Sequence, residues 1–333
     1  MATLKDVAAL AGVTVTTVSR VLNNRGYISE QTRGKVYDAM KELHYQPNEL
    51  ARSLTKRRTN IIGVIVPSIA HPYFSKVADT LERCAAANGY KILLCNSNHQ
   101  REKEIEYLAM LESNKVAGIV LCSRTADIEE HLRRDLPLVA YERGVSSQVS
   151  SVSCDNYQGG ELASERLVAS GCRHLLHIGG SAGVHMPADQ RCEAFSAVCK
   201  RHGVEGRVFH TQEAQFQAMD YAAFIRKLLE ENPQTDGVFA SSDVIAAQVL
   251  QACAALGRRV PEDVQVIGFD DVELASLTFP RITTIRQPIK EMCTFAIDNI
   301  VQQLEKGGPI AKTVFSVSLV ERETTRRMRN EGV

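Results

Sequence analysis

The chain has 333 residues, 44% of them apolar, and it contains 39 Lys and Arg against 39 Asp and Glu. This length exceeds the core of one ordinary domain and suits a small module joined to a larger body. Because no run of about 18 apolar residues and no signal peptide are found, we expect a cytoplasmic protein that does not enter a membrane. Nine cysteines without a Cys-x-x-Cys pair favour reduced thiols over a disulfide framework.

Two short capped helices are predicted at the start of the chain. Thr3 can cap a helix that has Asp6 at its third position and that ends at Gly12. Thr14 can cap a second helix over residues 15–22. Two such helices joined by a Gly-containing turn of about four residues form a helix-turn-helix, which is a reader of double-stranded DNA.

A third helix is predicted to begin at Ser29 and to close a three-helix core. Charge is also segregated onto this part of the chain. Residues 1–60 contain ten Lys and Arg against five Asp and Glu, a net charge of +5, so the remainder carries −5. A basic module on an acidic body orients the molecule toward DNA phosphates.

From residue 61 onward, short apolar strands alternate with segments long enough for a helix. One set of four strands is predicted at 61–66, 91–95, 118–122 and 138–141, and a second set at 174–178, 206–210, 237–240 and 265–269. Continuous apolar strands of this kind form parallel sheets that are covered on both faces. Two sets predict two doubly wound subdomains, with a ligand cleft at the carboxyl ends of their strands.

A group of short motifs carries a family resemblance. They are Leu4-Lys5-Asp6-Val7-Ala8, Ala11-Gly12-Val13-Thr14, Thr17-Val18-Ser19-Arg20-Val21-Leu22-Asn23, Tyr45-Gln46-Pro47-Asn48 and Ala51-Arg52-Ser53-Leu54. Together they resemble the LacI/GalR (lactose repressor type) family of bacterial transcription regulators. A looser likeness continues through residues 61–66 and 264–271 to 283–288, so that it covers nearly the whole chain.

The resemblance implies an N-terminal all-α helix-turn-helix headpiece over residues 1–46 and a hinge helix with its linker over 47–60. The α/β body over 61–333 would be like a periplasmic binding protein, with two doubly wound parallel-sheet subdomains. The chain would cross between them three times. We therefore expect the first subdomain to comprise about 61–157 and 288–322, and the second about 158–287.

The predicted recognition helix would place Val15, Thr16 and Arg20 in the major groove. In the family, the hinge helix orders on the operator and inserts a leucine, here Leu54, into the minor groove; the alternative is a Leu54 packed on the body. The complete set of expected DNA contacts is Thr3, Thr14, Val15, Thr16, Ser19, Arg20, Asn23, Asn48, Ala51 and Leu54.

Candidate ligand residues fall near the ends of strands. Tyr73 and Phe74 follow the first strand and either stack on a sugar ring or nucleobase or act as a hydrophobic staple. Glu142 and Asp270 follow later strands, and Arg191 begins a helix. Ionised side chains suit a polyhydroxylated ligand because they make strong directional hydrogen bonds to hydroxyls. In the family, the positions of Arg191 and Asp270 contact ligand, although each alone is compatible with a salt bridge.

One departure from the family concerns Ser242, which stands where many relatives have Asn. A hydroxyl offers fewer hydrogen bonds than an amide, so the sugar that relatives recognise cannot be transferred to this chain.

An enzyme is the competing class. Residues 179–183 read Gly-Gly-Ser-Ala-Gly and match the G-x-S-x-G nucleophile elbow of α/β-hydrolases. That fold needs a late histidine, and none follows His210, so we interpret the match as a Gly-rich loop of the ligand cleft. His174 and His177 would lie on opposite faces of a strand. We expect no catalytic residue, no metal site and no cofactor.

The sequence thus predicts a homodimeric repressor of a carbohydrate-utilisation operon, bound to a palindromic operator and released by a sugar or sugar phosphate. One alternative is a purine-type, corepressor-dependent repressor in which Tyr73 and Phe74 stack the base. Another is a ligand-independent DNA-binding protein, which a charged cleft disfavours. Residues 323–329 lack the leucine heptads that would join two dimers.

Overall fold

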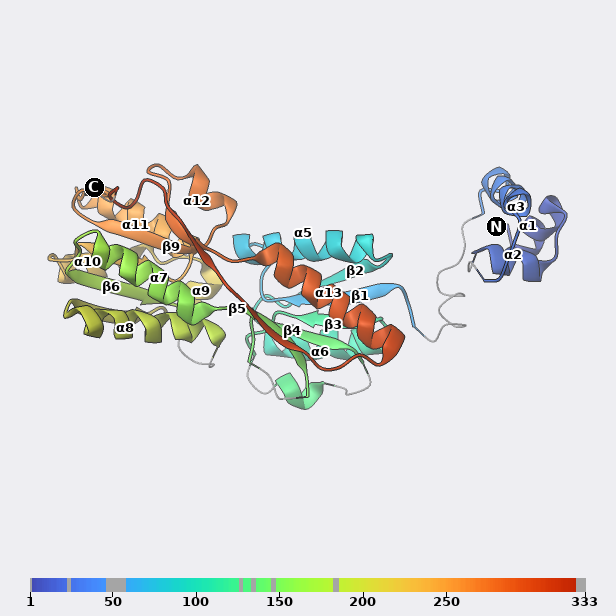
Figure 1. The fold of residues 1–333 in the computed structure, drawn as a ribbon, viewed down its shortest axis with the longest axis horizontal. Coiled ribbons are helices and arrows are strands. Elements are labelled where there is room, and N and C mark those ends of the chain that lie inside the picture. The colour runs from blue at the N-terminus through green and yellow to red at the C-terminus, as the bar shows by residue number, and fades with distance from the viewer. Residues whose placement is uncertain are drawn as a thin grey trace, which may run out of the picture. The chain divides into compact units, whose positions relative to one another are not determined.

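The structure is a computed structural model that describes residues 2–22, 25–45, 58–125, 128–132, 136–144, 148–181 and 186–327. The chain divides into two compact units, Met1–Thr59 and Asn60–Val333 (Figure 1). Within the described residues, no helix is long and apolar enough to cross a membrane. All nine cysteines are free thiols.

The first unit contains three helices, α1 (Leu4–Ala11), α2 (Val15–Leu22) and α3 (Glu30–Glu42). The predicted caps are confirmed. Thr3 and Asp6 form a reciprocal capping box, and Gly12 ends α1 in the left-handed region. Thr14 Oγ1 accepts from Thr17 N at 3.1 Å, and Ser29 Oγ accepts from Thr32 N at 3.3 Å. The helices enclose a small core whose fully buried members are Val7, Val18 and Val36.

The first subdomain of the body is built on a six-stranded parallel sheet. Its strands are β1 (Ile61–Val66), β2 (Lys91–Asn96), β3 (Gly118–Leu121), β4 (Leu138–Tyr141), β5 (Ser150–Cys154) and β11 (Lys312–Phe315), in the order β11-β5-β4-β3-β1-β2. The helices are α5 (Pro72–Ala87), α6 (Arg101–Ser113), α13 (Ile289–Lys306) and the 3₁₀ helix η1 (Ile128–His131). Ile62, Val64 and Val66 pack with α5 and α13, whereas Ile65 packs with α6 on the other face.

The second subdomain repeats this design with one antiparallel edge. Its strands are β6 (His174–Gly179), β7 (Glu205–His210), β8 (Gly237–Ala240), β9 (Gln265–Asp270), β10 (Thr283–Arg286) and β12 (Ser318–Val320), in the order β12-β10-β9-β8-β6-β7. Only the pairing of β12 with β10 is antiparallel in this described sheet. The helices are α7 (Asn156–Ala169), α8 (Gln190–His202), α9 (Glu213–Ala218), α10 (Ala222–Glu231), α11 (Asp243–Ala255), α12 (Glu273–Leu277) and the 3₁₀ helix η2 (Pro187–Asp189). α7 packs on α8, and α10 packs on α11 (Figure 1).

The chain passes between the two sheets three times. The passages lie between β5 and α7, between β10 and α13, and between β11 and β12. The last one corrects the boundary expected near residue 322, because β12 already belongs to the second sheet. Buried hydrogen bonds hold the following segment there, with Thr283 N donating to Thr324 Oγ1 at 2.8 Å and Thr324 Oγ1 donating to Val266 O at 2.6 Å.

The contact between α7 and α8 depends on a glycine. A Cβ at Gly160 would lie 2.6 Å from the carbonyl oxygen and 2.8 Å from the Cα of Arg191. We expect Gly160→Ala to lower the free energy of unfolding by about 1–3 kcal/mol, because backbone atoms cannot move aside locally. Gly144→Ala is the control, since a Cβ there meets no atom within 4 Å. Equal stability of both variants in urea denaturation would contradict this close approach.

Candidate functional site

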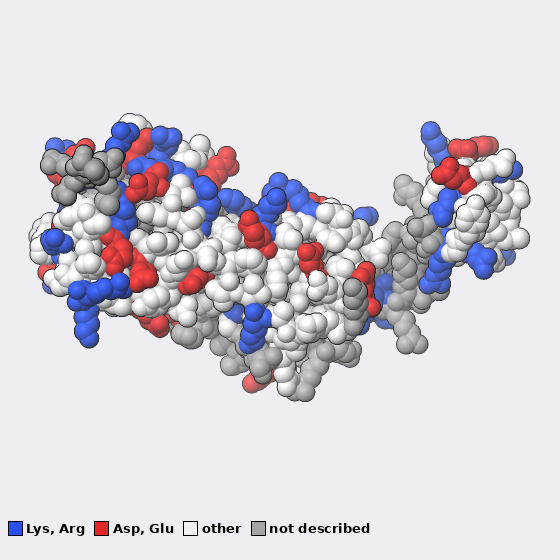
Figure 2. Space-filling model, viewed as in Figure 1, with Lys and Arg blue, Asp and Glu red and all other residues white. Residues whose placement is uncertain are grey.

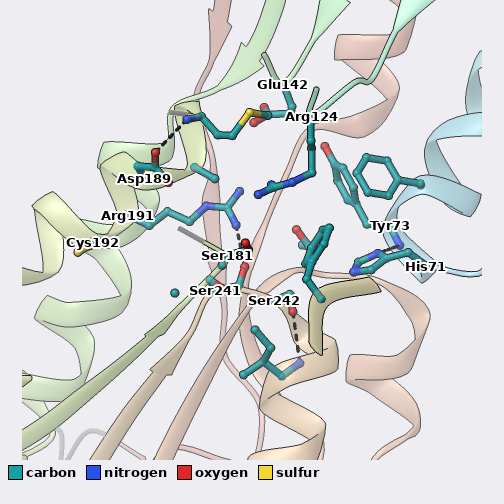
Figure 3. A pocket seen from close by; sticks show the side chains of 18 of the residues that line it. His71, Tyr73, Arg124, Glu142, Ser181, Asp189, Arg191, Cys192, Ser241 and Ser242 are labelled. Atoms are coloured by element: carbon teal, nitrogen blue, oxygen red, sulfur yellow. Dashed lines mark hydrogen bonds between the residues drawn. The ribbon is translucent and has the colours of Figure 1, made fainter. Parts of the chain in front are cut away.

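A cavity of about 110 Å³ lies between the two subdomains, at the carboxyl ends of their strands (Figure 3). Side chains of both subdomains line it. The structure brings together all six predicted ligand residues on its wall, namely Tyr73, Phe74, Glu142, Arg191, Ser242 and Asp270.

Arg191, in the first turn of α8, is held in place by three groups. Its Nε donates to Asn156 Oδ1 at 2.7 Å and its Nη1 donates to Ser241 O at 2.7 Å. Its Cζ lies 3.4 Å from the ring centroid of Phe269. A guanidinium fixed by hydrogen bonds and a stacked ring loses little freedom when a ligand binds. The position is therefore preorganised to donate to a ligand.

Glu142 follows β4 and contributes a carboxylate from the first subdomain to the wall of the cavity. Its carboxylate accepts from Cys154 N and, at 3.2 Å, from Asn156 Nδ2. Burial raises the pKa of Glu142, and Arg191 together with these hydrogen bonds acts in the opposite direction. Asn156 thus bonds to Glu142 with its amide NH₂ and to Arg191 with its oxygen, which joins the two walls.

Asp270 ends β9 and is connected to the first subdomain through Gln287. Burial raises the pKa of Asp270, against the attraction of Arg191. Gln287 Nε2 donates to Asp270 Oδ1 at 2.7 Å, and Gln287 Oε1 accepts from Tyr73 Oη at 2.9 Å. Tyr73 lies on α5. A hydrogen-bonded relay therefore runs from the cavity carboxylate to a helix of the other subdomain.

Asp271 forms a second link between the subdomains, through its carbonyl oxygen. Its carboxylate accepts from Arg286 Nε and Arg322 Nη2, both at 2.6 Å, while its carbonyl accepts from Lys76 Nζ at 3.0 Å. Burial would raise the pKa of Asp271, but the two guanidinium groups outweigh it and lower that pKa. Both Asp270 and Asp271 have positive φ, at 111° and 53°. Such backbone is held only where surrounding contacts fix it.

The remaining predicted residues have structural contacts as well. Phe74 packs edge-to-face on His71 and on Tyr73, with ring centroids 5.5 Å and 5.3 Å apart. Ser242 caps α11, because its Oγ accepts from Ile245 N at 3.3 Å. The Ser242 hydroxyl, which stands where many relatives have the amide of an Asn, therefore already accepts a hydrogen bond from the backbone of α11.

Several wall residues were not predicted from the sequence. They are His71, Arg124, Asp189, Phe216, Tyr221 and Gln287. Arg124 lies three residues beyond β3, so the rule that selected Glu142 at a strand end would have found it. Phe216 lies in the short helix α9, which was not predicted from the sequence.

The G-x-S-x-G loop contributes Gly179, Gly180 and Ser181 to the wall of the cavity. No hydrogen bond joins Ser181 Oγ to a histidine in the described part of the chain. His177 is buried, and its Nδ1 is paired with Phe239 O at 3.0 Å. Within the same residues, no group of three or more His, Cys, Asp or Glu could hold a metal ion.

In the headpiece, Val15, Thr16 and Arg20 are exposed on α2, and Ser19 is half-buried beside them. Thr3 and Thr14 are exposed caps. Four expected DNA contacts lie outside the described residues, namely Asn23, Asn48, Ala51 and Leu54. On the face of the body seen in Figure 2, Lys and Arg interleave with Asp and Glu. The described part of this face therefore carries no large patch of a single charge.

The relay through Gln287 leads to a stability prediction. Tyr73→Phe leaves the buried Gln287 Oε1 without its donor, so we expect a loss of about 1–3 kcal/mol in the free energy of unfolding. Tyr141→Phe is the control, because within the described residues the hydrogen-bond partners of that buried hydroxyl are the sulfur atoms of Met292 and Cys293, at 4.0 Å and 3.8 Å. The two variants are compared by urea denaturation, and a Tyr73→Phe protein no weaker than the control would contradict the relay.

Comparison with known proteins gives the same architecture. Residues 3–48 match the family model described as bacterial regulatory proteins, lacI family, and residues 164–325 match the periplasmic binding protein-like domain. The chain is 38% identical to a ribose operon repressor of Halalkalibacterium halodurans, over 99% of each chain. It is also 38% identical to a sucrose operon repressor of Pediococcus pentosaceus, over 91% of this chain and 92% of that protein.

Two solved structures extend the comparison. A lac repressor dimer bound to operator and an anti-inducer has a TM-score of 0.83 and 26% identity, over 97% of this chain and 99% of that chain. A periplasmic binding protein/LacI transcriptional regulator from Alkaliphilus metalliredigens, complexed with D-xylulofuranose, has a TM-score of 0.71 and 32% identity, over 81% of this chain and 100% of that chain. With its capped helix-turn-helix, its two-subdomain body and these full-length relatives, the chain belongs to the lacI family of bacterial regulatory proteins.

Proposed function

We propose that the protein represses a carbohydrate-utilisation operon as a homodimer on a palindromic operator and is released when a sugar-type inducer binds the cleft. The observation that carries this proposal is a cavity in which Glu142 of one subdomain and Arg191 and Asp270 of the other surround the same space. Carboxylates accept from sugar hydroxyls, and a fixed guanidinium donates to them. Similarity to ribose and sucrose operon repressors supports a sugar.

The purine alternative has less support. Tyr73 is buried, its hydroxyl is paired with Gln287 and its ring packs edge-to-face with Phe74, so little of the ring is exposed for stacking on a base. A ligand-independent DNA-binding protein would not need a buried cavity with carboxylates on both walls. We also infer that the protein acts on nucleoid DNA in the cytoplasm and catalyses no reaction, in keeping with relatives that are named repressors.

In the headpiece, α2 is the recognition helix of this proposal. Val15, Thr16 and Arg20 form its exposed face, while Val18 and Val21 are buried in the three-helix core. An arginine at such a position can bind guanine through two hydrogen bonds, and a valine can pack on a thymine methyl group. The hinge contacts at Asn48, Ala51 and Leu54 and the contact at Asn23 remain part of the proposal.

Arg20→Ala tests the recognition helix. We expect it to weaken specific operator binding by about 1–3 kcal/mol and to relax the preference at one base pair per half-site. Lys41→Ala is the control, since it removes the same charge from α3. Binding is measured at fixed salt against an operator and a set of single-base variants. Preserved affinity and base preference in Arg20→Ala would exclude this assignment of α2.

Release from DNA follows from closure of the cleft. A ligand that touches both walls binds the closed form more tightly than the open form, and only such a difference can shift the equilibrium. Tyr73 and Lys76 of α5 both bond across the boundary between the subdomains, so closure would alter these bonds. We infer that this movement is passed across the dimer to the hinge that precedes β1.

Arg191→Ala tests the cleft. Loss of the guanidinium leaves ligand acceptors unpaired, which costs about 1–3 kcal/mol, so we expect inducer affinity to fall ten-fold or more. Operator binding without inducer should stay normal. Arg201→Ala, at the exposed end of the same helix, should keep both properties. Normal induction in Arg191→Ala would place the ligand elsewhere, whereas weak operator binding would give Arg191 a structural role.

A further inference from the structure

The side chain of Phe216 contacts the first subdomain, although α9 belongs to the second. The centroid of its ring lies 6.2 Å from that of His71 and 5.2 Å from that of His99. The guanidinium carbon of Arg124 lies 4.6 Å from the centroid of the same ring. Aromatic rings at these separations attract one another, and a cation over a ring is attracted by its quadrupole. One half-buried ring therefore joins the two subdomains. We call these four residues the Phe216 cluster.

The three partners of Phe216 lie just beyond the carboxyl ends of three neighbouring strands. His71 follows β1 and caps α5, His99 follows β2, and Arg124 follows β3. His99 N donates to Pro67 O at 3.1 Å, and His71 Nδ1 accepts from Tyr73 N at 3.3 Å. Burial lowers the pKa of His71 to about 4 and also lowers that of His99. Near pH 7 both rings are therefore neutral and pack without adding charge beside Arg124.

Glu213 adds an electrostatic attraction between α9 and the first subdomain. It lies on α9, one turn before Phe216. Burial lowers the pKa values of Arg124 and His99, whereas Glu213 raises both. Asp189 of the second subdomain also raises the pKa of Arg124. A carboxylate that favours the charged form of Arg124 also favours the approach of α9 to it.

α9 is held by the second subdomain. Gln248 of α11 bonds twice to the chain that follows α9. Its Oε1 accepts from Tyr221 N at 2.7 Å, and its Nε2 donates to Met219 O at 2.8 Å. A helix tied down in this way moves with its own subdomain. Phe216 must therefore leave its partners when the two subdomains separate.

The Phe216 cluster lies far from the connections between the subdomains. Those connections leave β5, β10 and β11, and β11 and β12 are edge strands of their sheets. α9 instead follows β7, the opposite edge of the second sheet, and His99 follows β2, the opposite edge of the first. A hinge rotation about the connections separates these far edges most. The cluster thus spans the side of the cleft that opens furthest.

We propose that the Phe216 cluster is a latch that holds the cleft closed and must release before any molecule enters or leaves the cavity. His71, Arg124 and Phe216 line the cavity (Figure 3), whereas His99 stands outside its wall. The latch therefore reaches from the cavity to its rim. Its contacts are formed between protein groups, so it controls how often the cavity opens whatever ligand is bound. This role goes beyond the proposed function.

Two native cysteines allow the opening to be measured. Cys122 lines the cavity and is 2% exposed, so a maleimide reaches its thiol when the cavity opens. Cys253 is fully buried in the core of the second subdomain and reports unfolding instead. The ligand-free, full-length protein is treated with N-ethylmaleimide at fixed pH. The rate of modification at each thiol is then followed by mass spectrometry of its peptide.

We expect Phe216→Ala to raise the rate at Cys122 at least about five-fold, as the loss of a cation–π contact and two aromatic contacts allows. The rate at Cys253 should not change. Phe216→Tyr keeps the ring and should keep the wild-type rates. Phe224→Ala is the matched control, because it removes a half-buried ring of α10 that packs on the same core as Cys253. It should leave the rate at Cys122 unchanged.

Arg124→Gln tests the latch from the first subdomain. It should raise the rate at Cys122 about two-fold or more, because the cation–π contact is lost. In the Phe216→Ala background the same substitution should add much less, since partners in one contact are coupled.

Equal rates at Cys122 in Phe216→Ala and the wild type would overturn this inference. A ring that served only to contact a ligand would give that result, because the measurement contains no ligand. Fully additive effects of the two substitutions would also overturn it, as would equal acceleration at Cys122 and Cys253, which indicates unfolding. None of these measurements involves an operator or a sugar, so the proposed function is tested separately by Arg20→Ala and Arg191→Ala.

Discussion

The arrangement of the cleft depends on the contacts made by the guanidinium of Arg191. It stacks on Phe269 of β9 while bonding to Asn156 of α7 and to the carbonyl of Ser241 after β8. α8 can bring it there only because α7 has glycines at the contact. A Cβ at Gly159 would lie 2.6 Å from the Phe269 ring, and one at Gly160 would meet the backbone of Arg191. Small residues on one helix thus position the charged group of the next.

The passages between subdomains explain how a ligand can act at a distance. Asp270 and Asp271 are adjacent in the chain but have different partners. Asp270 lines the cavity and accepts from Gln287, whereas Asp271 accepts from Arg286 and Arg322. α5 is bonded to this pair of residues through Tyr73 and Lys76. A change in the protonation or ligation of Asp270 therefore alters contacts that hold the first subdomain in place. Coupling of this kind requires two discrete arrangements rather than a continuous deformation.

Local patterns explain which parts of the fold were predictable from the sequence. The eight predicted strands are short segments rich in apolar residues, and all eight are present. Four strands were missed, namely β5, β10, β11 and β12. β11 and β12 have only four and three residues, and β5 and β10 have the polar sequences SSVSC and TTIR. Their polar groups are buried by distant partners, as when Thr283 Oγ1 pairs with Thr325 Oγ1 at 2.9 Å. The residues of the candidate site divide in the same way, into those that local sequence predicts and those that only tertiary contacts place. Strand ends located Glu142 and Asp270, whereas Phe216 and Gln287 enter the cavity only through tertiary contacts.

The buried ionisable groups of the cleft also explain why cleft closure can depend on a ligand. Burial disfavours the charged forms of Glu142, Asp270 and Arg124, and closure without a ligand would bring the two carboxylates no new partner. Like charges on Arg124 and Arg191 add repulsion between the walls. The free energy that opposes closure would therefore reside mainly in the same side chains that we propose to bind the ligand. A ligand that pairs these groups gains most in the closed form, and this difference in affinity is the quantity that a switch requires.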